Sequence, residues 1–96
     1  MIRHIVLVKA GPDVAEAHLA AIFTDLAALK DKLPGVLAIH SGRSDSPEKI
    51  ERGYLHGFTV DFSDWAALQA YQDHPDHKRV GAALVAAAEG GINGIL

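Results

Sequence analysis

A run of large apolar residues, spaced alternately three and four positions apart, constrains this chain more than any other feature. Its members are Leu19, Ile22, Leu26, Leu29 and Leu33. This spacing places every side chain on one face of a helix, so we predict one continuous helix that packs on an apolar layer. Asp13, followed by Glu16 three residues later, resembles a capping box and predicts the start of the helix. Pro34-Gly35 predicts its end.

Three other segments have the composition of strands. Residues 2–9 are rich in β-branched side chains and predict a strand that is mostly buried on both faces. Residues 36–41 lie between turn residues and predict a second strand. Residues 54–62 alternate in character, with a bulky and largely apolar even-numbered face, and predict a third. The polar stretch 42–53 predicts a long loop that acts as a mobile lid or contacts a second copy.

The remaining residues predict two shorter helices and a last strand. A helix over residues 64–72 and another over residues 76–88 are separated by Pro75, which cannot continue the first helix but suits the first turn of the second. The second of these helices is rich in alanine and contains Gly81, which allows close packing on the sheet or leaves room for a ligand. Residues 92–96 predict a short strand after two glycines.

The element order is therefore β-α-β-β-α-α-β, in 96 residues that amount to a single domain, 1–96. This order predicts an α+β sandwich of split-βαβ type, in which helices cover one face of an antiparallel four-stranded sheet. We expect the first and third strands to be central neighbours that run parallel. His4 and His56 would then lie side by side on the same sheet face, because both are even-numbered and early in their strands.

The opposite face of the sheet is also predicted to be apolar. It carries Ile5, Leu7 and Leu55, which alternate with the histidine-bearing face. We therefore predict a homodimer in which two sheets pack face to face, a solution that also suits a domain too small to bury much surface alone.

Composition excludes several classes of function. The chain has no cysteine, which rules out disulfides, thiolate catalysis and cysteine-based zinc sites. Its formal net charge is −3 and it has no basic stripe, so we expect no nucleic-acid partner. The apolar start is too short for a signal peptide or a membrane span, which predicts no membrane partner and a cytoplasmic location.

Titratable side chains gather in Tyr71-Gln72-Asp73-His74-Pro75-Asp76-His77-Lys78. His77 could act as a general base near neutral pH, and Tyr71 could donate a hydrogen bond to an enolate or aldol oxygen. The alternative is that His77 caps the following helix while Tyr71 is a core residue. His74 precedes the proline, which predicts an extended, solvent-facing residue. We expect no metal site from the two histidines, because the proline disrupts their helical spacing.

The presence of two histidines, His4 and His56, inside apolar predicted strands also needs a physical reason. Burying such a ring without a partner costs roughly 1–3 kcal/mol, so each should find a hydrogen bond, a water or a ligand. A core histidine bonded to a neighbouring side chain or carbonyl is the alternative to a functional one.

Four segments together resemble the stress-responsive A/B-barrel (Dabb) domain family. They are Arg3-His4-Ile5-Val6-Leu7, Leu33-Pro34-Gly35-Val36, Gly53-Tyr54-Leu55-His56-Gly57-Phe58 and Tyr71-Gln72-Asp73-His74-Pro75-Asp76-His77. The resemblance spans essentially the whole chain, and its tyrosine-histidine-proline segment is the most specific part. It implies a ferredoxin-like protomer, a dimeric α+β barrel and, for many members, a link to stress responses.

The resemblance also implies roles for four residues. A plant polyketide cyclase of this family closes a linear polyketide by aldol condensation, and its catalytic tyrosine and histidine match Tyr71 and His77. Two histidines that line the pocket of that cyclase match His4 and His56.

We therefore expect a homodimer with an internal pocket between helices and sheet. Its predicted lining residues are His4, His56, Phe58, Trp65, Leu68, Tyr71 and His77. This mixture suits a small, partly apolar, carbonyl-bearing ligand and needs no cofactor. Acid–base chemistry on a β-keto compound is the first hypothesis, a non-catalytic stress-linked binding module is the second, and a structural dimer with a filled core is the third. A continuous cavity that reaches His77 favours the first two.

Overall fold

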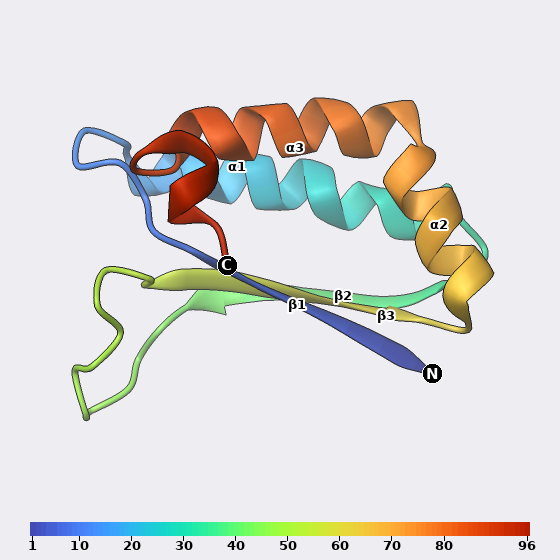
Figure 1. Ribbon diagram of the computed structural model, residues 1–96, viewed down its shortest axis with the longest axis horizontal. Coiled ribbons are helices and arrows are strands. Elements are labelled where there is room, and N and C mark those ends of the chain that lie inside the picture. Colours follow the sequence, from blue (N-terminus) through green and yellow to red (C-terminus); the bar gives the residue numbers. More distant parts are fainter.

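The computed structural model describes all residues, Met1–Leu96, and arranges them in two layers, with helices on one side of a sheet (Figure 1). Along the chain the elements are β1 (Ile2–Val8), α1 (Glu16–Ala27), the 3-10 helix η1 (Ala28–Asp31), β2 (Val36–Arg43), β3 (His56–Phe62), α2 (Trp65–Asp73), α3 (Pro75–Ala87) and the 3-10 helix η2 (Gly91–Gly94). The predicted α+β fold of ferredoxin-like type is confirmed. No helix is both long enough and apolar enough to cross a membrane.

The sheet has three strands in the order β1-β3-β2, and both pairs are antiparallel. The expectation that β1 and β3 run parallel is therefore wrong. The crossover through α1 returns the chain so that β1 and β2 point the same way, and the β2–β3 connection inserts β3 between them in the opposite direction. Ile2 consequently faces Phe62, and Val8 faces His56.

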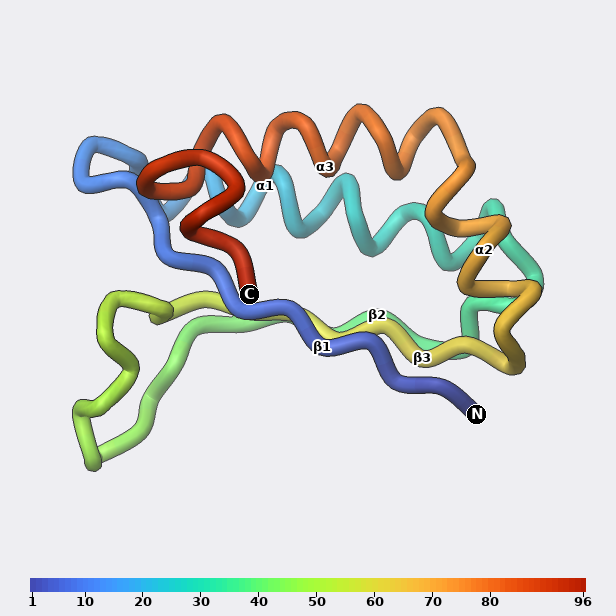
Figure 2. Tube along the Cα trace, viewed as in Figure 1, coloured from blue at the N-terminus to red at the C-terminus, as the bar shows by residue number.

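A fourth regular strand does not form, although the end of the chain lies where it was expected. Leu96 exchanges two backbone hydrogen bonds with Leu7, at 2.9 and 3.1 Å, and the nitrogen of Lys9 donates to the Gly94 carbonyl at 2.8 Å. Figure 2 shows this segment returning to β1. The pairing of this segment with β1 stays short because Gly90, with a positive φ of 72°, begins a compact turn, and the next residues, Gly91–Gly94, form η2.

The core lies between the helices and the even-numbered face of the sheet. Four members of the predicted apolar stripe are buried there: Leu19, Ile22, Leu26 and Leu29. The fifth, Leu33, is only partly buried, since the α-helix ends at Ala27 and a 3-10 turn follows. The stripe is therefore confirmed, but the helix that carries it is shorter than its spacing predicts.

The helix starts differ from the predicted caps. Asp13 does not cap α1, which begins at Glu16 with Ala15 at the capping position and no side-chain hydrogen bond. In α2, the Asp64 side chain is the cap and accepts a hydrogen bond from the Ala67 nitrogen at 2.8 Å.

The last helix, α3, is capped by His74. Its Nδ1 accepts a hydrogen bond from the Asp76 nitrogen at 3.0 Å, and Pro75 occupies the first turn as predicted. His74 is therefore half-buried rather than solvent-facing, and His77 is not the cap. This capping position is filled by the residue immediately before the proline, whose extended backbone turns the ring back toward the helix.

The other face of the sheet is uncovered. Ile5 and Leu7 are 61% and 42% exposed there, and the loop of residues 44–55 extends on this side, away from the helices (Figure 1).

Candidate functional site

A cavity of about 190 Å³ lies between the helix layer and the even-numbered face of the sheet. Most of its wall is aliphatic or aromatic, and its polar groups come from three side chains: His4 on β1, Tyr71 on α2 and His77 on α3. β1, α2 and α3 thus direct their only polar lining groups into one apolar space, which is the composition of a ligand site.

Tyr71 and His77 are in direct contact. Their ring centroids are 4.3 Å apart, with the planes inclined at 48°, and Tyr71 also packs edge-on against Phe62. Tyr71 is 2% exposed, and this burial raises its pKa to about 12. The phenol is therefore neutral at physiological pH, which makes it a hydrogen-bond donor rather than a base.

His77 has the complementary character. Burial lowers its pKa, a hydrogen bond to the Gln72 carbonyl opposes that shift, and the nearby His4 adds a smaller lowering. Nδ1 lies 3.3 Å from the Gln72 carbonyl oxygen, which can only accept, so we assign the proton to Nδ1. The assignment leaves the Nε2 lone pair available, and the neutral ring can accept a proton near neutral pH.

The cavity contains four of the predicted lining residues: His4, Phe58, Tyr71 and His77. Trp65 does not line it, because α2 lies at one end of the sheet and turns this side chain outward, where it is 71% exposed. Leu68 packs against the core but is not part of the cavity wall.

His56 lies on the same sheet face as His4 but not beside it. The antiparallel register places His4 opposite Val60 and His56 opposite Val8, so the two histidines are near opposite ends of the sheet. His56 lines a different hollow.

Sequence reasoning missed most of the apolar wall. Val80 and Leu84 of α3 contribute to it, together with Ile92 and Ile95 near the end of the chain, whereas Gly81 was already a candidate for leaving room for a ligand. The i, i+4 spacing of Val80 and Leu84 signalled an inward helix face. A Cβ built on Gly81 would meet no atom within 4 Å, so this glycine leaves space at the cavity rather than permitting close packing.

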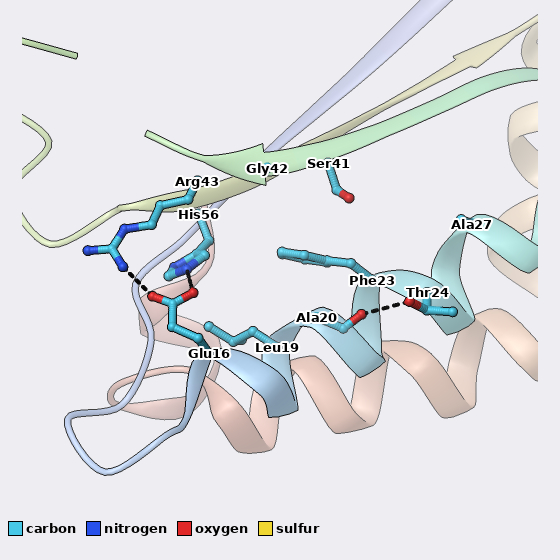
Figure 3. Close-up of a pocket in the computed structure, with 10 residues that line it drawn as sticks. All are labelled: Glu16, Leu19, Ala20, Phe23, Thr24, Ala27, Ser41, Gly42, Arg43 and His56. Atoms are coloured by element: carbon cyan, nitrogen blue, oxygen red, sulfur yellow. Dashed lines mark hydrogen bonds and ion pairs between the residues drawn. The ribbon is translucent and has the colours of Figure 1, made fainter. Parts of the chain in front are cut away.

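The second hollow, of about 360 Å³, is a groove between α1 and the end of β2 (Figure 3). At one end, Nε2 of His56 lies 3.0 Å from a carboxylate oxygen of Glu16, whose other oxygen pairs with Arg43. These contacts, led by the hydrogen bond with His56, lower the pKa of Glu16. Nδ1 of His56 is buried and has no hydrogen-bond partner. Phe23 lines both this groove and the cavity.

An antiparallel sheet with helices on one face and a small apolar cavity between the layers defines a ferredoxin-like α+β protein with an internal pocket. The chain belongs to the stress responsive A/B barrel domain (Dabb) family, whose model matches residues 2–90. No curated protein matches the sequence significantly.

Solved structures extend this result. A dimeric ferredoxin-like protein of unknown function from Jannaschia sp. CCS1 is 34% identical, with 98% of this chain and 91% of that chain covered and a TM-score of 0.91. A Dabb-family protein with a ferredoxin-like fold from Mesorhizobium loti is 32% identical over 79% and 73% of the two chains, with a TM-score of 0.61. The hydroxynitrile lyase of Passiflora edulis shares the fold at 20% identity, over 91% and 82%, with a TM-score of 0.81.

Proposed function

We propose that the protein is a homodimer whose cavity binds a small, partly apolar, carbonyl-bearing molecule, and that Tyr71 and His77 perform acid–base chemistry on it. One observation carries this proposal: a neutral phenol and a neutral imidazole are in ring contact inside a cavity whose wall, apart from His4, is otherwise apolar. A donor and a base held together in a largely apolar cavity are what proton abstraction beside a carbonyl requires.

The chemistry follows from the two protonation states. Nε2 of His77 takes a proton from the carbon next to the carbonyl, while the Tyr71 hydroxyl donates a hydrogen bond to the oxygen on which negative charge develops. The enolate then attacks a second carbonyl of the same molecule and forms a carbon–carbon bond. The imidazolium returns its proton to the resulting alkoxide, so no cofactor or oxidant is consumed.

A non-catalytic binding module is the second candidate. The cavity volume of about 190 Å³ favours it, because pockets for drug-sized ligands usually occupy about 300–1,000 Å³. Only a compact ligand fits, and a small cavity gives a polyketide little room to fold. A structural dimer with a filled core is disfavoured, since open space reaches His77.

The uncovered sheet face supports the dimer. Ile5 and Leu7 expose apolar surface in its middle. Near one end, Arg3 donates two hydrogen bonds to Asp61, at 2.7 and 3.1 Å, so this charged pair is already satisfied and can be covered by a partner at modest cost. The protein from Jannaschia, which this chain matches over nearly its whole length, is also described as dimeric.

Hydrogen–deuterium exchange of 2-hexanone in D₂O, followed by proton NMR, tests the chemistry. This ketone has one carbonyl and a short apolar chain, and its α-protons exchange slowly without a catalyst. We expect the protein to accelerate exchange. His77→Gln should lower this acceleration at least about 100-fold, and Tyr71→Phe should lower it as well. His18→Gln, which changes an exposed histidine on α1, should exchange like the wild type.

The outcomes separate the two candidates. Binding of 2-hexanone that shifts the Gly81 amide resonance, without faster exchange, would support the binding module. The absence of both binding and exchange would contradict the proposal. Circular dichroism and melting curves confirm that each variant is folded.

A further inference from the structure

We propose that the groove between α1 and β2 is a second binding site, specific for small apolar carboxylates, and that Glu16 occupies its carboxylate position until a ligand displaces it. The site is distinct from the cavity that contains Tyr71 and His77, and it does not depend on the function proposed for that cavity. Its residues come from α1, from the end of β2 and from the first residue of β3 (Figure 3).

The charged end of the groove is built like a carboxylate site. Arg43 and Nε2 of His56 both face the carboxylate of Glu16, one on each oxygen. A guanidinium and an imidazole N–H that converge on two oxygens are the donors that recognise a carboxylate in proteins. In this structure the chain itself supplies the anion.

Glu16 is a displaceable occupant. Its side chain is 60% exposed, it is the first residue of α1, and its contacts to His56 and Arg43 can be exchanged for water by a change of rotamer. His56 is different, because its side chain is only 7% exposed and its ring packs near Phe23, with centroids 6.5 Å apart. The protein therefore holds one donor, His56, in place, while the acceptor and the exposed side chain of Arg43 can both move.

The unpaired Nδ1 of His56 is the second observation that points to a ligand. This atom is buried and forms no hydrogen bond within the protein. Such atoms are rare in folded proteins, and each calls for an explanation. A polar group of a ligand, or a water that enters with it, would provide the missing partner.

The rest of the groove suits an apolar body. From Glu16 its floor follows one face of α1 as far as Ala27, a distance of about 16 Å at the usual helical rise. Ala20 and Ala27 leave space, and the ring of Phe23 forms one wall (Figure 3). A Cβ on Gly42, across the groove, would meet nothing within 4 Å. A monocarboxylate with an aliphatic chain fits this groove, because one end of the groove binds a carboxylate and the floor is made of small residues.

Titration with octanoate, followed by amide NMR, tests the proposal, with octanamide as the uncharged control ligand. The Gly42 amide reports the groove and the Gly81 amide reports the cavity. We expect octanoate to shift Gly42. Glu16→Gln should bind it about three- to fivefold more tightly, because the internal competitor has lost its charge. Arg43→Gln should reduce affinity at least about tenfold.

Matched variants separate the site from general charge effects. Asp25→Asn and Arg79→Gln alter a surface ion pair between α1 and α3, at 3.6 Å, and should leave octanoate binding unchanged. Ala20→Leu keeps a good helix former at an exposed position but fills the groove, so it should abolish the shift of Gly42.

Three results would overturn the proposal. They are an affinity in Glu16→Gln no higher than in the wild type, equal binding of octanoate and octanamide, and shifts confined to Gly81. The last result would assign octanoate to the cavity and would leave the proposal for Tyr71 and His77 intact.

Discussion

At the scale of single residues, the protein uses burial to set protonation. Tyr71 and His77 occupy the same apolar surroundings, yet burial favours the neutral form of both, so the phenol remains a donor and the imidazole remains an acceptor. Glu16 shows the opposite outcome, because hydrogen bonds and opposite charge keep its carboxylate ionised. The two hollows therefore differ in charge at neutral pH. The cavity holds the neutral pair of Tyr71 and His77, and the groove holds the ionised pair of Glu16 and Arg43.

The lowered pKa of His77 makes stability depend on pH. The folded protein binds a proton on this side chain at a lower pH than the unfolded chain, whose histidine titrates near 6.5, so stability falls as pH drops through about 6.5 and levels off below the folded pKa. We expect the urea-derived unfolding free energy to fall more between pH 7.5 and 5.5 in the wild type than in His77→Gln. Carboxylates titrate lower and are common to both proteins. Equal slopes would contradict the prediction.

At the scale of elements, the sequence pattern predicted correctly those features that depend on residues close together in the chain. The proline break between α2 and α3 follows from a few consecutive residues, and so does the proximity of Tyr71 and His77. The stripe of α1 was equally readable, because a 3.6-residue period survives any tertiary arrangement.

What the sequence could not predict depends on distant contacts. His56 meets Glu16 across 40 positions, through the register of β3 and the exact start of α1. Trp65 continues the helical spacing of Leu68 and Tyr71, but the position of α2 at the end of the sheet leaves it in solvent. The direction of β3 depends on its insertion between β1 and β2, which run parallel to each other, and no single segment of the sequence determines that arrangement.

The cap of α3 gives an element-scale prediction. His74 satisfies the Asp76 nitrogen with its ring, so His74→Ala should lower the unfolding free energy by about 0.5–2 kcal/mol. His74→Asn, which supplies a side-chain oxygen to the same nitrogen, should retain most of the stability. Urea unfolding of the three proteins at pH 7.5 measures this, and equal losses in both variants would show that the ring stabilises α3 by packing instead.

At the scale of the whole molecule, only one of the two faces of the sheet is covered by other parts of the chain. Helices bury one face completely enough to form the core, whereas the other exposes Ile5 and Leu7. An antiparallel sheet tolerates one solvated face when that face is polar, whereas the middle of this face exposes two large apolar side chains. The inequality explains why a chain of this size would associate.

Sedimentation equilibrium at micromolar concentration should give about twice the chain mass of 10.2 kDa. Ile5→Glu, which places a charge in the middle of the uncovered face, should convert the protein to monomers. Trp65→Glu makes a similar change at an exposed apolar residue on the helix layer and should leave the mass unchanged. A wild-type monomer at this concentration would exclude the sheet-to-sheet dimer.

Phe23 forms part of the wall of both hollows, and this shared side chain has a thermodynamic consequence. Any molecule that shifts the ring of Phe23 when it binds in one hollow changes the free energy of binding in the other. Linkage requires the effect to be equal in both directions, so a groove ligand that tightens cavity binding by some factor must itself bind more tightly by that factor when the cavity is filled. One aromatic ring thus suffices to make two chemically unlike sites report on each other's occupancy.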